Sequence, residues 1–114
     1  MKIRKIALAF MGASALLASF SANAVYNANM TGVVIAVITY TDGDYIYFQL
    51  NNQPSTHPSC NPGYFVITAD VPADRRKALL AQLMLAKTTG ATTQIGYDNA
   101  GDCANGYIRV HRVG

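Results

Sequence analysis

The side chains of this chain that could do chemistry are two histidines, two cysteines and six aspartates. His57 lies in a proline-rich loop and His111 lies near the C-terminal end, and no third ligand accompanies them, whereas zinc sites usually have about four ligands. The aspartates fall mostly in turn-like sequence, where Asp side chains cap backbone amides. Neither G-x-S-x-G nor H-E-x-x-H occurs. We therefore expect no catalytic residues, no metal site and no cofactor, and hence no enzyme.

The two cysteines, Cys60 and Cys103, both lie in turn-like segments, "HPSCNPG" and "NAGDCANG". The chain has no Cys-x-x-Cys motif, which makes a redox pair or a metal site a weaker interpretation than a structural disulfide. In the chain-entropy model, closing a loop of this size stabilises a protein by roughly 4 kcal/mol. We therefore expect a Cys60–Cys103 bridge, which would also leave neither cysteine as a nucleophile.

The first residues have the pattern of a secretory signal. Lys2, Arg4 and Lys5 precede an apolar run, and Ala22-Asn23-Ala24 offers small residues for cleavage. The run is short and rich in Ala and Ser for a membrane span of about 20 residues, although a retained N-terminal anchor is the alternative. We expect a signal peptide at residues 1–24, one mature domain at 25–114 and a periplasmic or secreted location, which suits a disulfide.

The net charge of +3 comes from the predicted signal peptide. Three of the nine basic residues lie before residue 25, which leaves six basic residues against six aspartates. A near-neutral mature chain lacks the basic face that nucleic-acid binding needs. We therefore expect no nucleic-acid partner and, after cleavage, no membrane span.

Five segments have strand patterns: 31–40, 45–50, 64–68, 92–98 and 107–113. Asp42-Gly43 between the first two indicates a hairpin, because both residues tolerate positive φ. In the second segment, alternation places Ile46, Phe48 and Leu50 towards the core and Tyr45, Tyr47 and Gln49 on the other face. In the last segment, Tyr107, Arg109, His111 and Val113 share the face opposite Ile108, Val110 and Arg112.

A helix is expected between Asp70, as N-cap, and Gly90, as the closing residue. Pro72 suits the first turn and Asp74 suits the positive end of the helix dipole. The predicted core-facing arc consists of Leu79, Leu80, Leu83, Met84 and Ala86. A second, weaker strip contains Ala78, Ala81 and Leu85. This strip is either an alanine-rich exposed face or a surface for a partner.

The predicted order is three strands, a helix and two strands. This is the order of the OB-fold, a small five-stranded Greek-key barrel, and the predicted disulfide would then span the helix. We expect a mainly β, OB-fold-like barrel, and an open α+β sheet with the helix on one face is the alternative.

Several segments resemble small secreted proteobacterial proteins of largely unassigned role: "TGVVIAVITYTDGDYIYFQL", "CNPGYFVIT", "RRKALLAQLMLAK", "TTQIGYDNAGDC" and "GYIRVHRVG". More distantly, the pattern is similar to the B subunit of subtilase cytotoxin, an OB-fold glycan-binding protein that assembles into a ring. The resemblance implies the fold and, by analogy, binding of a glycan and formation of a homo-oligomer. It transfers no sugar-contacting residue to this chain.

The candidate binding residues are Tyr45 and Tyr47, together with the amides Asn51 and Asn52 that follow the same strand. Aromatic faces beside amides suit sugar rings, which present flat C–H patches and hydroxyls. The tyrosines could equally pack over the barrel with only their hydroxyls in water. The chain is thus expected to be a non-enzymatic binding module for a glycan or a cell-surface protein. The alternative is a monomeric accessory protein of the cell envelope that has no small ligand.

Overall fold

The computed structural model describes residues 26–114, so the predicted signal peptide lies outside the described residues. All five predicted strands and the predicted helix form, with ends that shift by a few residues. The elements are β1 (Ala28–Thr39), β2 (Ile46–Leu50), β3 (Asn61–Ile67), α1 (Ala73–Thr89), β4 (Thr92–Tyr97), β5 (Cys103–Ala104) and β6 (Tyr107–Val113).

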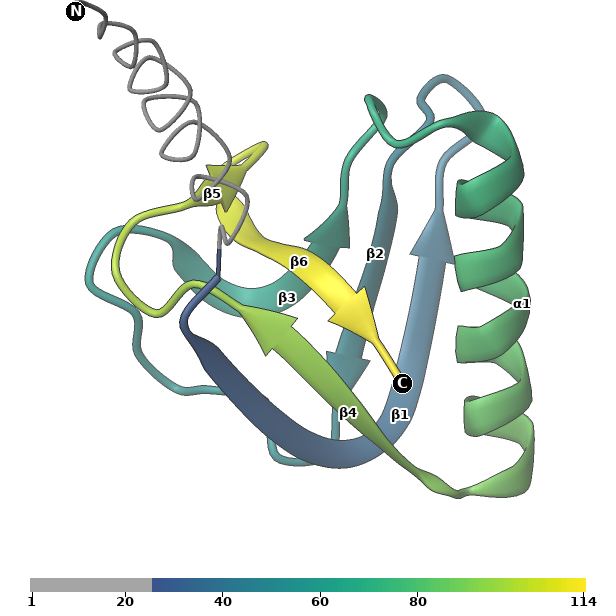
Figure 1. The fold of residues 1–114 in the computed structure, drawn as a ribbon, viewed down its shortest axis with the longest axis horizontal. Coiled ribbons are helices and arrows are strands. Elements are labelled where there is room, and N and C mark those ends of the chain that lie inside the picture. Colours follow the sequence, from purple (N-terminus) through teal and green to yellow (C-terminus); the bar gives the residue numbers. More distant parts are fainter. Residues whose placement is uncertain (1–25) are drawn as a thin grey trace, which may run out of the picture.

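The strands close into a five-stranded barrel of OB-fold type, with α1 between its third and fourth strands (Figure 1). The long strand β1 pairs with β4 through residues 28–33 and with β2 through residues 34–39, and the β1–β2 pairing contains a register shift between Val34 and Ala36. The barrel then continues from β2 to β3 on one side of β1 and from β4 to β6 on the other side. Parallel pairing of β3 with β6 closes the ring. The open-sheet alternative is therefore wrong, because it would leave β3 and β6 as free edges.

Alternation along the strands builds the core as predicted. Ile46, Phe48 and Leu50 of β2 are buried, as are Ile108 and Val110 of β6. The ring centroids of Phe48 and Phe65 lie 5.5 Å apart inside the barrel. These inward positions fill a small barrel with aliphatic and aromatic side chains, as barrels of this size require.

The helix begins later than predicted. Its N-cap is Pro72, and no side chain caps its first turn, so the prediction of Asp70 as N-cap is wrong. A turn in which the Val71 N–H donates to the Thr68 carbonyl intervenes, and the Asp70 carboxylate accepts a hydrogen bond from the Thr68 hydroxyl instead. At the other end, Gly90 adopts φ 73°, and its N–H donates to the Ala86 carbonyl, which confirms it as the closing residue.

The predicted apolar arc of α1 is only partly correct. Leu83 and Ala86 are buried, and Leu79 and Leu80 pack against the core. Met84 is 45% exposed and Leu85 is 65% exposed. The helix lies beside β1 (Figure 1) and contacts mainly that strand, so the arc that it buries is narrower than the pattern indicated.

Two turns differ from their predicted roles. The β1–β2 hairpin forms, but its last pair is Thr39 with Ile46, and neither Asp42 nor Gly43 has positive φ. Residues 40–45 form a longer loop in place of a two-residue mirror-image turn. Asp42 and Gly43 therefore do not need positive φ. The tight turn lies instead at Asn105 (φ 51°) and Gly106 (φ 87°), between the unpredicted strand β5 and β6.

The predicted disulfide is confirmed. Cys60, directly before β3, is bonded to Cys103 of β5, and their Cα atoms lie 5.5 Å apart. The bridge therefore joins β3 to the short hairpin that leads into β6. Within residues 26–114, no helix combines the length and apolar character needed to cross a bilayer.

Candidate binding face

Five tyrosines gather on the outer surface of the barrel, over β2, β3 and β6. We call this set the tyrosine face; its members are Tyr40, Tyr45, Tyr47, Tyr64 and Tyr107. Tyr47 occupies the middle, with its ring centroid 5.6 Å from that of Tyr40 and 5.7 Å from that of Tyr107. Tyr64 and Tyr107 also meet edge to face, at 5.8 Å. Edge-to-face rings at these distances attract one another, so the cluster is a packed surface.

Three strands hold the tyrosine face rigid. Tyr47 lies between the buried Ile46 and Phe48 of β2, which fixes its side chain on the outside by strand alternation. Val66 of β3 is the cross-strand partner of Tyr47, and it has no exposed surface although it belongs to the outer side. The tyrosine face therefore covers apolar surface of its own, which makes it a fixed platform.

The loops on either side complete the tyrosine face. Asn105, in the tight turn before β6, donates a hydrogen bond from Nδ2 to the Tyr47 hydroxyl at 2.5 Å. Asn105, Tyr40 and Tyr47 line two shallow hollows of about 260 and 220 Å³. Asp42 and Gly43 of the β1–β2 loop line the second hollow. In OB-folds the ligand-binding surface is a strand face together with loops of this kind.

The structure brings together only half of the predicted binding residues. Tyr45 and Tyr47 belong to the tyrosine face, and their rings stack 6.2 Å apart. Asn51 and Asn52 follow the opposite end of β2 and bind β1 instead. The Asn51 side-chain oxygen accepts from the Val33 N–H at 3.0 Å, and Asn52 Nδ2 donates to the Thr31 carbonyl at 2.9 Å. Their amide groups hold the bend of β1, because they satisfy backbone groups beside its register shift.

Sequence reasoning missed Tyr40, Tyr64, Tyr107 and Asn105 as members of this surface. The alternation of β6 already placed Tyr107 on the outward side. The missing information was the closure of the barrel, because only the β3–β6 pairing brings Tyr64 beside Tyr107. For Asn105, the Asn-Gly pair is itself a tight-turn signal.

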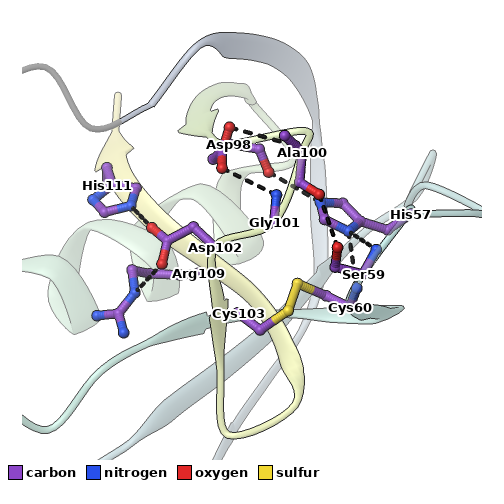
Figure 2. Close-up of a disulfide and its surroundings, with 10 residues drawn as sticks. All are labelled: His57, Ser59, Cys60, Asp98, Ala100, Gly101, Asp102, Cys103, Arg109 and His111. Atoms are coloured by element: carbon purple, nitrogen blue, oxygen red, sulfur yellow. Dashed lines mark hydrogen bonds and ion pairs between the residues drawn. A yellow bond between two sulfur atoms is a disulfide. The ribbon is translucent and has the colours of Figure 1, made fainter.

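A separate polar cluster surrounds Asp102, the residue before Cys103 of the disulfide (Figure 2). Its carboxylate accepts from Arg109 Nε at 3.0 Å and lies 2.5 Å from His111 Nε2. Arg109 also donates to the Thr68 hydroxyl at 3.3 Å. The hydrogen bond from Thr68, and then the nearby charge of Arg109, lower the pKa of Asp70 below its usual value of 3.8, against an opposing effect of burial.

His57 makes a third arrangement, which is structural. Its Nε2 lies 3.0 Å from the Asp98 carbonyl oxygen, and its Nδ1 accepts from the N–H groups of Ser59 and Cys60 (Figure 2). These partners select the neutral tautomer with the proton on Nε2. Within residues 26–114, no group of three or more His, Cys, Asp or Glu side chains is placed to hold a metal ion.

Comparisons with family models, with curated proteins and with solved structures each find no match for this chain. The resemblance to a toxin B subunit therefore remains an expectation from sequence features.

Proposed function

We propose that this protein is an exported, non-enzymatic binding module that recognises a glycan through the tyrosine face. The observation that carries the proposal is the group of five tyrosines at one end of β2, with two shallow hollows between their rings. Each hollow is smaller than the usual pocket of a drug-sized ligand, about 300–1,000 Å³. A sugar ring that lies on an aromatic face does not need an enclosed pocket.

The polar groups around the rings fit the same ligand class. The tyrosine hydroxyls, the Asn105 amide and the Asp42 carboxylate offer donors and acceptors at the rim of the hollows. Sugar hydroxyls both donate and accept hydrogen bonds, so they need partners of both kinds. Tyr40 is 61% exposed, which leaves one ring free to stack on a ligand. A cell-surface protein is the other occupant that this surface would suit, since tyrosine is enriched in protein interfaces.

A glycan array probed with the purified protein tests the proposal. We expect a restricted set of related glycans to bind, and we expect Tyr40→Ala to weaken binding to the best of them about tenfold, or ~1.4 kcal/mol. Ile35→Ala is the matched control, because Ile35 is also a large exposed side chain of the β1 region but lines neither hollow. Thermal midpoints of both variants equal to that of the unchanged protein would show that neither substitution disturbs the fold.

Tyr47→Phe adds a second readout. It keeps the ring and removes the hydroxyl that accepts from Asn105. We expect it to alter the ranking among bound glycans more than the total affinity, because hydrogen bonds select between hydroxyl configurations. An array with no signal would refute glycan recognition. Binding that Tyr40→Ala leaves unchanged would place the sugar site elsewhere.

A further inference from the structure

A hollow larger than the two at the tyrosine face lies away from that face, beside the first turns of α1 and along β6. Its volume is about 570 Å³, within the range of pockets that hold drug-sized ligands. We call it the α1–β6 groove. Three kinds of residue line it: apolar residues (Ile67, Val71, Pro72, Ala78, Leu79, Val110 and Val113), basic residues (Arg75, Arg109, His111 and Arg112), and Thr68 with Asp70.

The apolar residues of the groove belong to the barrel core or pack against it. Ile67 and Val110 are buried core residues, and Val71, Leu79 and Val113 pack on that core. Ile67 and Val110 are covered, whereas Val71, Leu79 and Val113 are half-buried and present the apolar surface of the groove. An apolar ligand would gain free energy by covering such surface, at about 25 cal/mol per Å².

The charges around the α1–β6 groove are predominantly positive. Three arginines line it against one aspartate, Asp70, and the neighbouring Asp102 is already paired with Arg109 and His111. Arg109 also lies 3.9 Å from Asp70. Within the described part of the chain, Arg75 and Arg112 make no salt bridge with a carboxylate side chain. Arg112 Nε donates to the Gly114 carbonyl oxygen at 2.9 Å. The guanidinium group of Arg75 therefore remains for an anion from outside.

The start of α1 contributes charges of both signs. Arg75 lies in the first turn beside Asp74, whose negative charge offsets part of the helix dipole, and no side chain caps the free N–H groups there. The amino end of a helix carries a partial positive charge that favours anions. The start of the helix and Arg75 favour the anionic group of a ligand. The apolar residues beside them favour its apolar part.

We propose that the α1–β6 groove is a second binding site, independent of the tyrosine face, for a small amphipathic carboxylate. The apolar chain of the ligand lies against Val71, Leu79 and Val113, and its carboxylate points to Arg75 at the start of α1. A guanidinium binds a carboxylate through two parallel hydrogen bonds, which suits a monocarboxylate end group.

Titration of the purified, isotopically labelled protein with octanoate, followed by NMR, tests this site. We expect saturable shifts confined to amides around the groove, such as those of Arg75, Leu79 and Val110. Octan-1-ol has the same apolar chain without the charge, and butyrate has the charge with a short chain. Both should bind at least fivefold more weakly than octanoate.

Two pairs of variants locate the ligand. Ala78→Phe places a ring in the groove and should weaken octanoate binding at least tenfold. Ala81→Phe adds the same ring to an exposed helix position that does not line the groove, and should leave binding unchanged. Arg75→Gln should weaken binding about fivefold, whereas Lys87→Gln, at the other end of α1, should not.

The outcomes are decisive in each direction. Equal affinity for octanoate and octan-1-ol would refute the carboxylate part of the proposal. Absence of saturable octanoate binding, or octanoate binding that both Ala78→Phe and Arg75→Gln leave intact, would refute the site. Arg75 is exposed and unpaired with carboxylates, so Arg75→Gln keeps the test valid even if Ala78→Phe fails to fold.

Discussion

His57 joins two loops that lie 41 residues apart in the chain. It contacts the Asp98 carbonyl on one side and the N–H groups of Ser59 and Cys60 on the other. The Ser59 hydroxyl donates to the Ala100 carbonyl beside it. One imidazole therefore provides a donor, Nε2, and an acceptor, Nδ1, at separate positions on the ring, and so reaches both loops. This arrangement accounts for a histidine that the sequence left without a role.

We predict that His57→Ala lowers the free energy of unfolding by about 1–3 kcal/mol, because it leaves backbone groups of both loops without partners. Urea denaturation followed by circular dichroism measures the change. Ser55→Ala is the control, since Ser55 is exposed in the same loop. A loss of similar size in both variants would mean that the loop as a whole, and not the imidazole, is sensitive.

At the scale of elements, the ends of strands and helices depend on backbone conformation that few residues tolerate. Asn105 and Gly106 both have positive φ in the turn that starts β6, and Gly90 has φ 73° at the end of α1. Gly43, in the β1–β2 loop, does not have positive φ. Glycines in similar turn-like segments thus have different roles. Gly90 and Gly106 allow a positive φ, and Gly43 does not need to.

We predict that Gly90→Ala destabilises the protein by about 1–2 kcal/mol, the cost of a left-handed conformation with a Cβ atom. A Cβ atom at Gly90 would meet no neighbour within 4 Å, so backbone strain alone sets this cost. Gly43→Ala also meets no neighbour and lacks the strain. It should therefore be neutral, or stabilising by up to about 1 kcal/mol through the unfolded chain. Thermal denaturation of both variants measures the difference, and equal midpoints would contradict the prediction.

At the scale of the whole molecule, the barrel closes through its least regular seam. The β3–β6 pairing is parallel and contains a register shift between Asn61 and Phe65, whereas the neighbouring seams are antiparallel. The Cys60–Cys103 bridge crosses beside this seam, because Cys103 pairs with Ile108 of β6. Tyr64 and Tyr107 lie on the same seam. The disulfide therefore supports both the closure of the barrel and two of the five residues of the tyrosine face.

We predict that loss of the bridge in the double variant Cys60→Ser/Cys103→Ser lowers the free energy of unfolding by about 4 kcal/mol, from a sequence separation of 43 residues. Urea denaturation of the oxidised protein, the reduced protein and the double variant measures this loss. The reduced protein and the double variant should agree. A loss below about 1 kcal/mol would show that the β3–β6 pairing forms without support from the disulfide.

Much of the fold could be predicted because it depends on local patterns. Alternation assigned the inward residues of β2 and β6, and the two turn-located cysteines predicted the bridge. Asp70 failed as an N-cap because Thr68 competes for its carboxylate, and Met84 failed as a core residue because α1 contacts a narrow strip of β1. The first failure comes from a local hydrogen bond between residues two apart, and the second comes from the contact between α1 and β1, which a helical wheel does not contain.

Local pattern was enough to assign the inward residues of β2 and β6, the end of the helix at Gly90 and the pairing of the two cysteines. Each of these depends on neighbours a few residues apart or, for the cysteines, on there being one possible intramolecular pair. That Tyr40, Tyr64 and Tyr107 join Tyr45 and Tyr47, and that Asn51 and Asn52 bind β1, became visible only in the folded barrel. Those residues come from segments that meet only when the barrel closes, and closure depends on pairing distant strands.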